Sequence, residues 1–203
     1  MFRTQLNIDK SHVWDEAIFY GLTLIGAPYC WWSGYGWLDN TSPSWSGTGP
    51  LPDTNKIFEH GVFCAGLVNL MLRKVGLTPP LNPPFNGGTD AYGKVYYDKL
   101  IEFDILKVRR GDAVFRPYLD IRDQGHIGIA LGDADDKLLQ CFAWNECSTE
   151  PGVNCNYTVR ESHNNGYYQF IIPREYLWST EILDLSLSES TEFCYKILNY
   201  EYT

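Results

Sequence analysis

The sequence predicts an α+β fold in which N-terminal helices pack on a central antiparallel β-sheet. Helical spacing of apolar residues dominates the first half of the 203-residue chain. Short apolar or alternating segments, separated by turn residues, dominate the second half. Helices followed by a meander of strands are typical of α+β domains rather than of parallel βαβ units. We expect one domain over residues 1–180 and a C-terminal extension over 181–203 that packs on it.

Three helices are expected in the first half. The first runs over residues 12–24, where Asp9 and Ser11 offer N-caps and apolar residues recur at helical spacing. The second, over 64–74, is apolar almost all round and should therefore be central and buried. A weaker helical pattern covers 91–103.

Loops and strands account for the other segments. Residues 38–60 are rich in Ser, Gly, Pro, Asn and Asp without any period, which predicts a long loop insertion. The alternating and short apolar segments predict strands over residues 112–115, 125–132, 137–143, 157–160 and 167–172.

Charge and hydropathy narrow the classes of partner. The formal net charge is −9 and the pI is about 4.8, so phosphate backbones and anionic membrane surfaces are poor partners. No run of about 18 apolar residues is present to span a membrane. The first ten residues lack the apolar stretch of a signal peptide, which favours a cytoplasmic protein as synthesised. Export as an effector, or origin as a phage or viral product, stays open.

The six cysteines do not have the spacing of zinc ligands, and we expect mostly reduced thiols. The acidic turn at 133–136 is interpreted as a solvated hairpin, so neither a metal nor a cofactor is expected. The sequence leaves open whether Cys147 and Cys155 form a disulfide, and it leaves the oligomeric state open.

Cys64 is the candidate nucleophile. A helix N-terminus stabilises a thiolate through its N–H groups and local dipole, and an imidazolium neighbour does so further. Cys64 opens the apolar helix, and His126, in the predicted strand from Gly125 to Gly132, is the candidate base. Each residue also has an ordinary interpretation. Cys64 could be a buried core thiol, because free cysteines are often buried, and His126 could be a structural histidine of a strand.

Four blocks in the sequence together resemble one family. Gly26-Ala27-Pro28-Tyr29-Cys30-Trp31 is similar to G-x-P-Y-x-W, and Cys64 opens a helix that ends near Gly76. Gly111 to Phe115 matches G-D-x-V-F, and His126 to Gly132 matches H-V-G-I-x-L-G. In this order the blocks resemble the NlpC (NlpC/p-sixty) family of papain-like cysteine peptidases.

The resemblance implies a papain-like NlpC fold and a set of site residues. Cys64 and His126 would be the catalytic pair. A third, polar residue on the next strand would orient the imidazole, which places Gln140 in that role, with His163 as the alternative. In the family the tyrosine matching Tyr29 lies beside the nucleophile, so Tyr29 is expected at the oxyanion or substrate site. Trp31, from the same motif, is expected there too.

Two departures from the family pattern affect the substrate. The aspartate before the cysteine and the serine after it are replaced by Phe63 and Ala65. In peptidoglycan endopeptidases of the family, those residues help to receive the amine of a stem peptide. Because an apolar pair cannot bind an ammonium group, the usual peptidoglycan bond is in doubt while the catalytic pair is present.

The sequence therefore predicts a cysteine hydrolase that cleaves an amide or isopeptide bond, in a cell-wall-like peptide or a related conjugate. The acyl-enzyme mechanism would use Cys64 and His126, with Gln140. One alternative is an acyltransferase or esterase on the same scaffold, because Phe63 and Ala65 suit a less charged substrate. The other alternative is a catalytically degenerate binding module.

Overall fold

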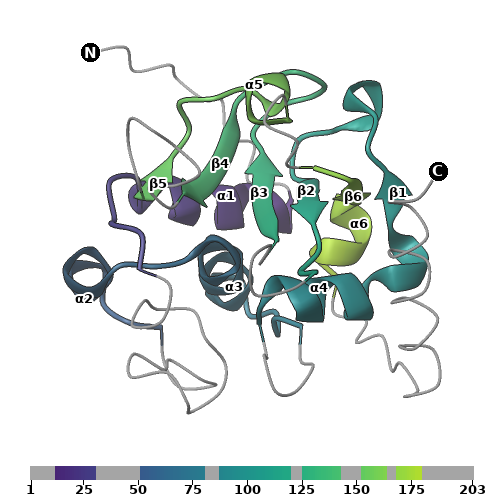
Figure 1. Ribbon diagram of the computed structural model, residues 1–203. Helices are drawn as coiled ribbons and strands as arrows, with labels where there is room; N and C mark the ends of the chain where they lie inside the picture. Colours follow the sequence, from purple (N-terminus) through teal and green to yellow (C-terminus); the bar gives the residue numbers. More distant parts are fainter. Residues whose placement is uncertain are drawn as a thin grey trace.

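The computed structural model describes residues 12–30, 51–80, 87–119, 125–142, 152–163 and 168–179 of the chain. Trp31, Cys147, the predicted C-terminal extension 181–203 and the side chain of His163 lie outside this description. Within the described residues, helices pack against an antiparallel sheet with strand order β1-β6-β2-β3-β4-β5 (Figure 1). The predicted α+β class, with N-terminal helices on an antiparallel sheet, is confirmed.

The chain is not divided into a helical first half and a stranded second half, because the short helices α5 and α6 also lie in the second half. The helices of the described segments are α1 (Val13–Thr23), α2 (Thr54–His60), α3 (Cys64–Lys74), α4 (Thr89–Val95), α5 (Val159–His163) and α6 (Arg174–Leu177), with 3₁₀ turns η1 (Tyr97–Lys99) and η2 (Ile105–Lys107). The strands are β1 (Ile101–Glu102), β2 (Ala113–Arg116), β3 (His126–Ala130), β4 (Leu138–Phe142), β5 (Gly152–Asn154) and β6 (Phe170–Ile172).

Three predicted elements are wrong in part. The stretch 38–60 is not loop throughout, because α2 occupies its last seven residues. The predicted helix over 91–103 ends at Val95 and gives way to η1 and β1. The predicted strand over 157–160 is wrong, because this segment leads into α5. The predictions of helices over 12–24 and 64–74 are confirmed by α1 and α3.

The sheet has apolar side chains on both faces, as strand alternation requires. On one face, Ile127, Ile129 and Leu139 pack in a cluster that includes α1 and α3. On the other face, a second cluster joins side chains of β2, β3 and β4 to α5 and to the segment before β6; its members are Val108, Val114, Ala130, Leu138, Val159, Tyr168 and Ile171. The sheet is therefore covered on both sides, and each strand residue can be assigned to the α3 face or the α5 face.

Candidate active site

Cys64 is the first residue of α3, and 8% of it is exposed. The N-cap before it is Phe63, whose backbone is extended. The first N–H groups of a helix have no acceptor within the helix, and a phenyl ring has no oxygen to cap them. An aspartate at this position would instead direct its negative charge toward those N–H groups. The neutral N-cap thus leaves the positive end of α3 suited to a thiolate.

The segment before Cys64 is fixed against two other parts of the chain. Tyr29 and Val62 form a parallel bridge, in which the Cys30 N–H donates to the Val62 carbonyl at 3.0 Å. The Cys141 thiol of β4 donates to the same carbonyl at 3.2 Å. Tyr29 therefore lies across from the residue two positions before Cys64, near the site where the resemblance places it.

His126 is the first residue of β3 and is fully buried. Gly125, before it, has a φ of +72°, and a Cβ added there would lie 2.5 Å from the Arg116 carbonyl oxygen. Only glycine combines this left-handed conformation with so close an approach. The His126 ring stacks on Phe142 with 5.1 Å between ring centroids and 9° between planes. The turn and the stacking together fix the position and plane of the imidazole.

Gln140 on β4 lies beside this ring. Its Oε1 is 3.1 Å from the Nε2 of His126, and both residues are fully buried. The same Oε1 accepts from the Tyr168 hydroxyl at 2.8 Å, while the Gln140 Nε2 donates to Ser162 Oγ at 2.9 Å. The structure thus brings together two of the three predicted catalytic side chains, in the contact that an orienting residue requires.

Strand alternation decides how Cys64 can approach His126. Gln140 contacts α5, so Gln140 and His126 point to the α5 face of the sheet. Helix α3 covers the opposite face. Because His126 is the first residue of β3, the beginning of that strand is where the start of α3 and the imidazole can meet. Figure 1 shows α3 beside the beginning of β3, and α3 packs against that strand.

Tyr92 on α4 is a further neighbour of Cys64. Its hydroxyl donates to Asn69 Oδ1 on α3 at 2.8 Å, and the Asn69 amide donates to the Gly87 carbonyl at 2.7 Å. Burial raises the pKa of Tyr92 well above its usual value, and the negative charges that Tyr96 and Cys64 can carry raise it further. Tyr92 therefore stays a neutral hydrogen-bond donor next to the nucleophile helix.

The residues flanking Cys64 are apolar and enclosed. Phe63 is 2% exposed and Ala65 is fully buried, and both belong to the cluster on the α3 face. Neither side chain offers a polar atom that could hold the ammonium group of a peptide substrate.

The described residues contain neither a cluster of metal ligands nor a long apolar helix. In those segments no group of three or more His, Cys, Asp or Glu side chains is arranged to hold a metal ion. The helices found there are too short or too polar to cross a bilayer.

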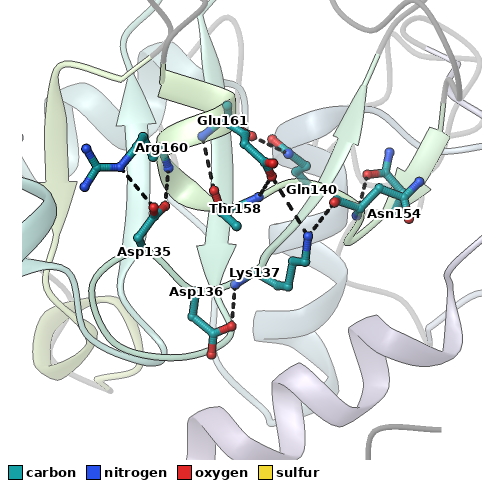
Figure 2. A network of polar contacts seen from close by, with 10 residues as sticks. Asp135, Asp136, Lys137, Gln140, Asn154, Thr158, Arg160 and Glu161 are labelled. Atoms are coloured by element: carbon teal, nitrogen blue, oxygen red, sulfur yellow. Dashed lines mark hydrogen bonds and ion pairs between the residues drawn. The ribbon is translucent and has the colours of Figure 1, made fainter. Parts of the chain in front are cut away.

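Sequence reasoning missed Ser162 and Tyr168, which both contact Gln140. A signal for Ser162 was present in Thr158-Val159-Arg160-Glu161, which has the form of a capping box. The Thr158 N–H donates to Glu161 Oε2 at 2.7 Å, and the Glu161 N–H donates to Thr158 Oγ1 at 3.2 Å (Figure 2). This reciprocal cap starts α5 and so places Ser162 over β4. Nothing in the sequence pairs Tyr168 with Gln140.

Solved structures of NlpC/P60 proteins are similar to this chain in fold. RipD from Mycobacterium tuberculosis, described as a non-catalytic NlpC/p60 domain protein with an adaptation to peptidoglycan-binding function, is 18% identical with a TM-score of 0.46; the match covers 80% of this chain and 97% of RipD. The P60 domain of antigen MAP1204 from M. avium subspecies paratuberculosis is 21% identical with a TM-score of 0.45, covering 80% and 94%. An NlpC/P60 family protein from Bacillus cereus is 14% identical with a TM-score of 0.45, and the match covers 85% of this chain but 44% of that protein. No protein-family model and no curated protein matches the chain.

Proposed function

We propose that this protein is a cysteine hydrolase that cleaves an amide or isopeptide bond through an acyl-enzyme. The observation that carries the proposal is the buried contact of 3.1 Å between His126 Nε2 and Gln140 Oε1. In this contact Nε2 of the ring is bonded to the amide that orients it. Nδ1 is then the nitrogen that would accept the proton of a thiol. The position of Cys64 at the start of α3 supports the same role.

Acylation would begin with transfer of the Cys64 proton to His126 Nδ1. The sulfur attacks the carbonyl carbon, a C–S bond forms, and the carbonyl electrons move to the oxygen. As the C–N bond breaks, the imidazolium returns its proton to the leaving amine. Gln140 keeps the ring oriented throughout, because its carbonyl accepts from the Nε2–H in both the neutral and the charged ring.

Deacylation would use the same groups with water as nucleophile. His126 Nδ1 takes a proton from water, the hydroxyl attacks the thioester carbon, and the C–S bond breaks with return of the proton to sulfur. The oxyanion of each tetrahedral intermediate would be stabilised by the Cys64 N–H at the start of α3, with the Tyr29 hydroxyl as a second donor.

The substrate class follows from the apolar flanks of the nucleophile. Phe63 and Ala65 are enclosed and uncharged, so a substrate with an amine at that position would not be held there. We therefore favour an amide or isopeptide of a peptide conjugate without a charged amine next to the scissile bond. An ester, or transfer of the acyl group to another acceptor, uses the same steps and is separated by product analysis with and without an added amine or alcohol.

A non-catalytic binding module is the second candidate. It is favoured by the opposite sheet faces of α3 and His126, and by the complete burial of the imidazole. In that case the buried His126–Gln140 pair would serve only to satisfy polar groups between β3 and β4, with Cys64 a core thiol.

The test is turnover of a panel of fluorogenic peptide amides, isopeptides and esters. The hydrolase predicts that Cys64→Ala abolishes turnover of every substrate that the wild type cleaves, whereas Cys155→Ala leaves it unchanged. Cys155 is the matched control because it is a half-buried cysteine that follows β5 and is not part of α3. Full turnover by Cys64→Ala would overturn the proposal.

A further inference from the structure

The side-chain amide of Gln140 is held by residues from three separate parts of the chain. His126 on β3, Ser162 on α5 and Tyr168 before β6 each contact it, at 3.1, 2.9 and 2.8 Å. Tyr168 and Ser162 are each 2% exposed, so water does not substitute for them easily. Ser162 belongs to α5, and Figure 2 shows Gln140 together with Thr158 and Glu161, the residues that cap this helix.

The orientation of this amide decides the chemistry of the histidine. When the Gln140 carbonyl faces His126, it can only accept, so Nε2 must carry a proton and Nδ1 of the neutral ring is basic. When the amide is rotated by half a turn, its NH₂ group faces Nε2, which must then be unprotonated. The proton of the neutral ring would then sit on Nδ1. This nitrogen could therefore no longer accept the proton of a thiol.

We infer that Tyr168 is a positioning residue that holds the Gln140 carbonyl toward His126 and thereby keeps the ring in its Nε2–H tautomer. Tyr168 donates to the same carbonyl oxygen that faces the imidazole, and Ser162 accepts from the NH₂ group at the other end of the amide. A phenol is a better donor than acceptor, so Tyr168 favours this orientation over the rotated one. The inference rests on the proposed function only for its catalytic consequence.

The aromatic packing around the ring supports a role in orientation. The Tyr168 ring lies 6.1 Å from the His126 ring, tilted by 39°, and 6.3 Å from Phe103. Tyr168 is therefore anchored by its ring in the cluster on the α5 face, and its hydroxyl points to the amide. The substitution Tyr168→Phe preserves this packing and removes only the hydroxyl, which makes it a clean test.

The experiment is ¹⁵N NMR of the four histidine rings in the full chain, with His126→Gln used to assign the signals. We expect a protonated Nε2 and an unprotonated Nδ1 at His126 in the wild type. In Tyr168→Phe the ratio of the Nδ1–H to the Nε2–H tautomer should rise about fivefold, which corresponds to the loss of one hydrogen bond of ordinary net strength. Tyr176→Phe is the matched control, since Tyr176 is an exposed tyrosine on α6, and it should leave the tautomer ratio unchanged.

A second substitution provides the rescue. Gln140→Glu in the Tyr168→Phe background supplies a carboxylate that can only accept, so it should restore the proton on Nε2, in the neutral or in the charged ring. Ser162→Ala is the second single variant, and it should change the tautomer ratio less than Tyr168→Phe does, because a hydroxyl can accept from the NH₂ group or donate to the carbonyl of the amide.

An Nδ1–H tautomer in the wild type would overturn the inference. An unchanged tautomer in the folded Tyr168→Phe variant would overturn it too. The tautomer is read without Cys64: if it shifts as expected while Cys64→Ala keeps full turnover, the hydrolase proposal fails and the positioning role stands.

Discussion

At the scale of single residues, several buried polar side chains around the candidate site are hydrogen-bonded to one another. Gln140 satisfies three partners at once, and Tyr92 and Asn69 fasten α4 to α3 beside Cys64. Such groups are costly to bury without partners, so their arrangement restricts the side chains to one geometry. Burial also keeps Tyr92 and Tyr96 neutral, because it raises the pKa of both hydroxyls. The stability of the fold should therefore depend on pH in alkaline solution.

Tyr96 predicts a loss of stability at high pH. It is 7% exposed, and burial raises its pKa to about 12. Between about pH 10 and pH 12 the unfolded chain has released the Tyr96 proton and the folded chain still holds it, so stability falls as pH rises. A shift of about two pKa units corresponds to at most about 3 kcal/mol. Urea unfolding from pH 8 to pH 12 should therefore show a shallower fall for Tyr96→Phe than for the wild type.

The control for this prediction is the exposed Tyr176, because Tyr176→Phe makes the same chemical change on the surface. Titration of lysines affects all three proteins alike and cancels in the comparison. An equal fall for Tyr96→Phe and the wild type would contradict the prediction.

At the scale of elements, the sequence predicted those whose apolar pattern is strong. Helix α3 is buried over its first nine residues, and its range was predicted correctly. Helix α2 was missed because Ile57 is its only buried residue, which leaves no period to recognise. Helix α5 was mistaken for a strand because Tyr157, Thr158 and Val159 favour strands, whereas the reciprocal contacts of Thr158 and Glu161 start a helix there.

The candidate site was predicted to a similar extent. The motifs pointed to Cys64, His126 and Gln140, and the structure places the last two in contact. Their catalytic roles, like that of Tyr29, stay predictions. Ser162 and Tyr168 could not be paired with Gln140 from the sequence, because they lie 22 and 28 residues further along the chain. They contact Gln140 only after α5 and the segment before β6 have packed on the sheet.

The turn before β3 predicts a large effect of a small substitution. Gly125 and Gly76 both have positive φ, at +72° and +78°. A Cβ at Gly125 would lie 2.5 to 2.8 Å from backbone atoms of Arg116 and Pro117, whereas a Cβ at Gly76 meets nothing within 4 Å. We expect Gly76→Ala to cost about 1–2 kcal/mol through its left-handed backbone alone. Gly125→Ala should cost about 2 kcal/mol more, because backbone must also move.

Urea denaturation of the two variants measures this difference directly. Because the displaced backbone leads into His126, Gly125→Ala should also lower the reactivity of Cys64, whereas Gly76→Ala should not. Equal losses in the free energy of unfolding would contradict the prediction, because the close approach at Gly125 would then not contribute to stability.

At the scale of the whole molecule, the candidate site is built from two elements on opposite sides of the sheet. Helix α3 covers one face and carries Cys64 at its start, while His126 points to the other face from the first position of β3. The Val62 carbonyl, which accepts from Cys30 and from Cys141, ties the start of α3 to the sheet. We propose that the thiol and the imidazole meet at this end of β3 as a functional pair.

The most direct test is site-resolved iodoacetamide alkylation from pH 5 to pH 10, read by peptide mass spectrometry. Cys155 is the internal comparator, because burial raises the pKa of its thiol, outweighing Lys137, which lowers it. We expect Cys64 to react at and below neutral pH, and Cys155 to react only in alkaline solution. In His126→Ala the reactivity profile of Cys64 should move to higher pH and that of Cys155 should not. If Cys64 is inert until the protein unfolds, or if its profile is the same without His126, the pair does not exist and the binding module is the better description.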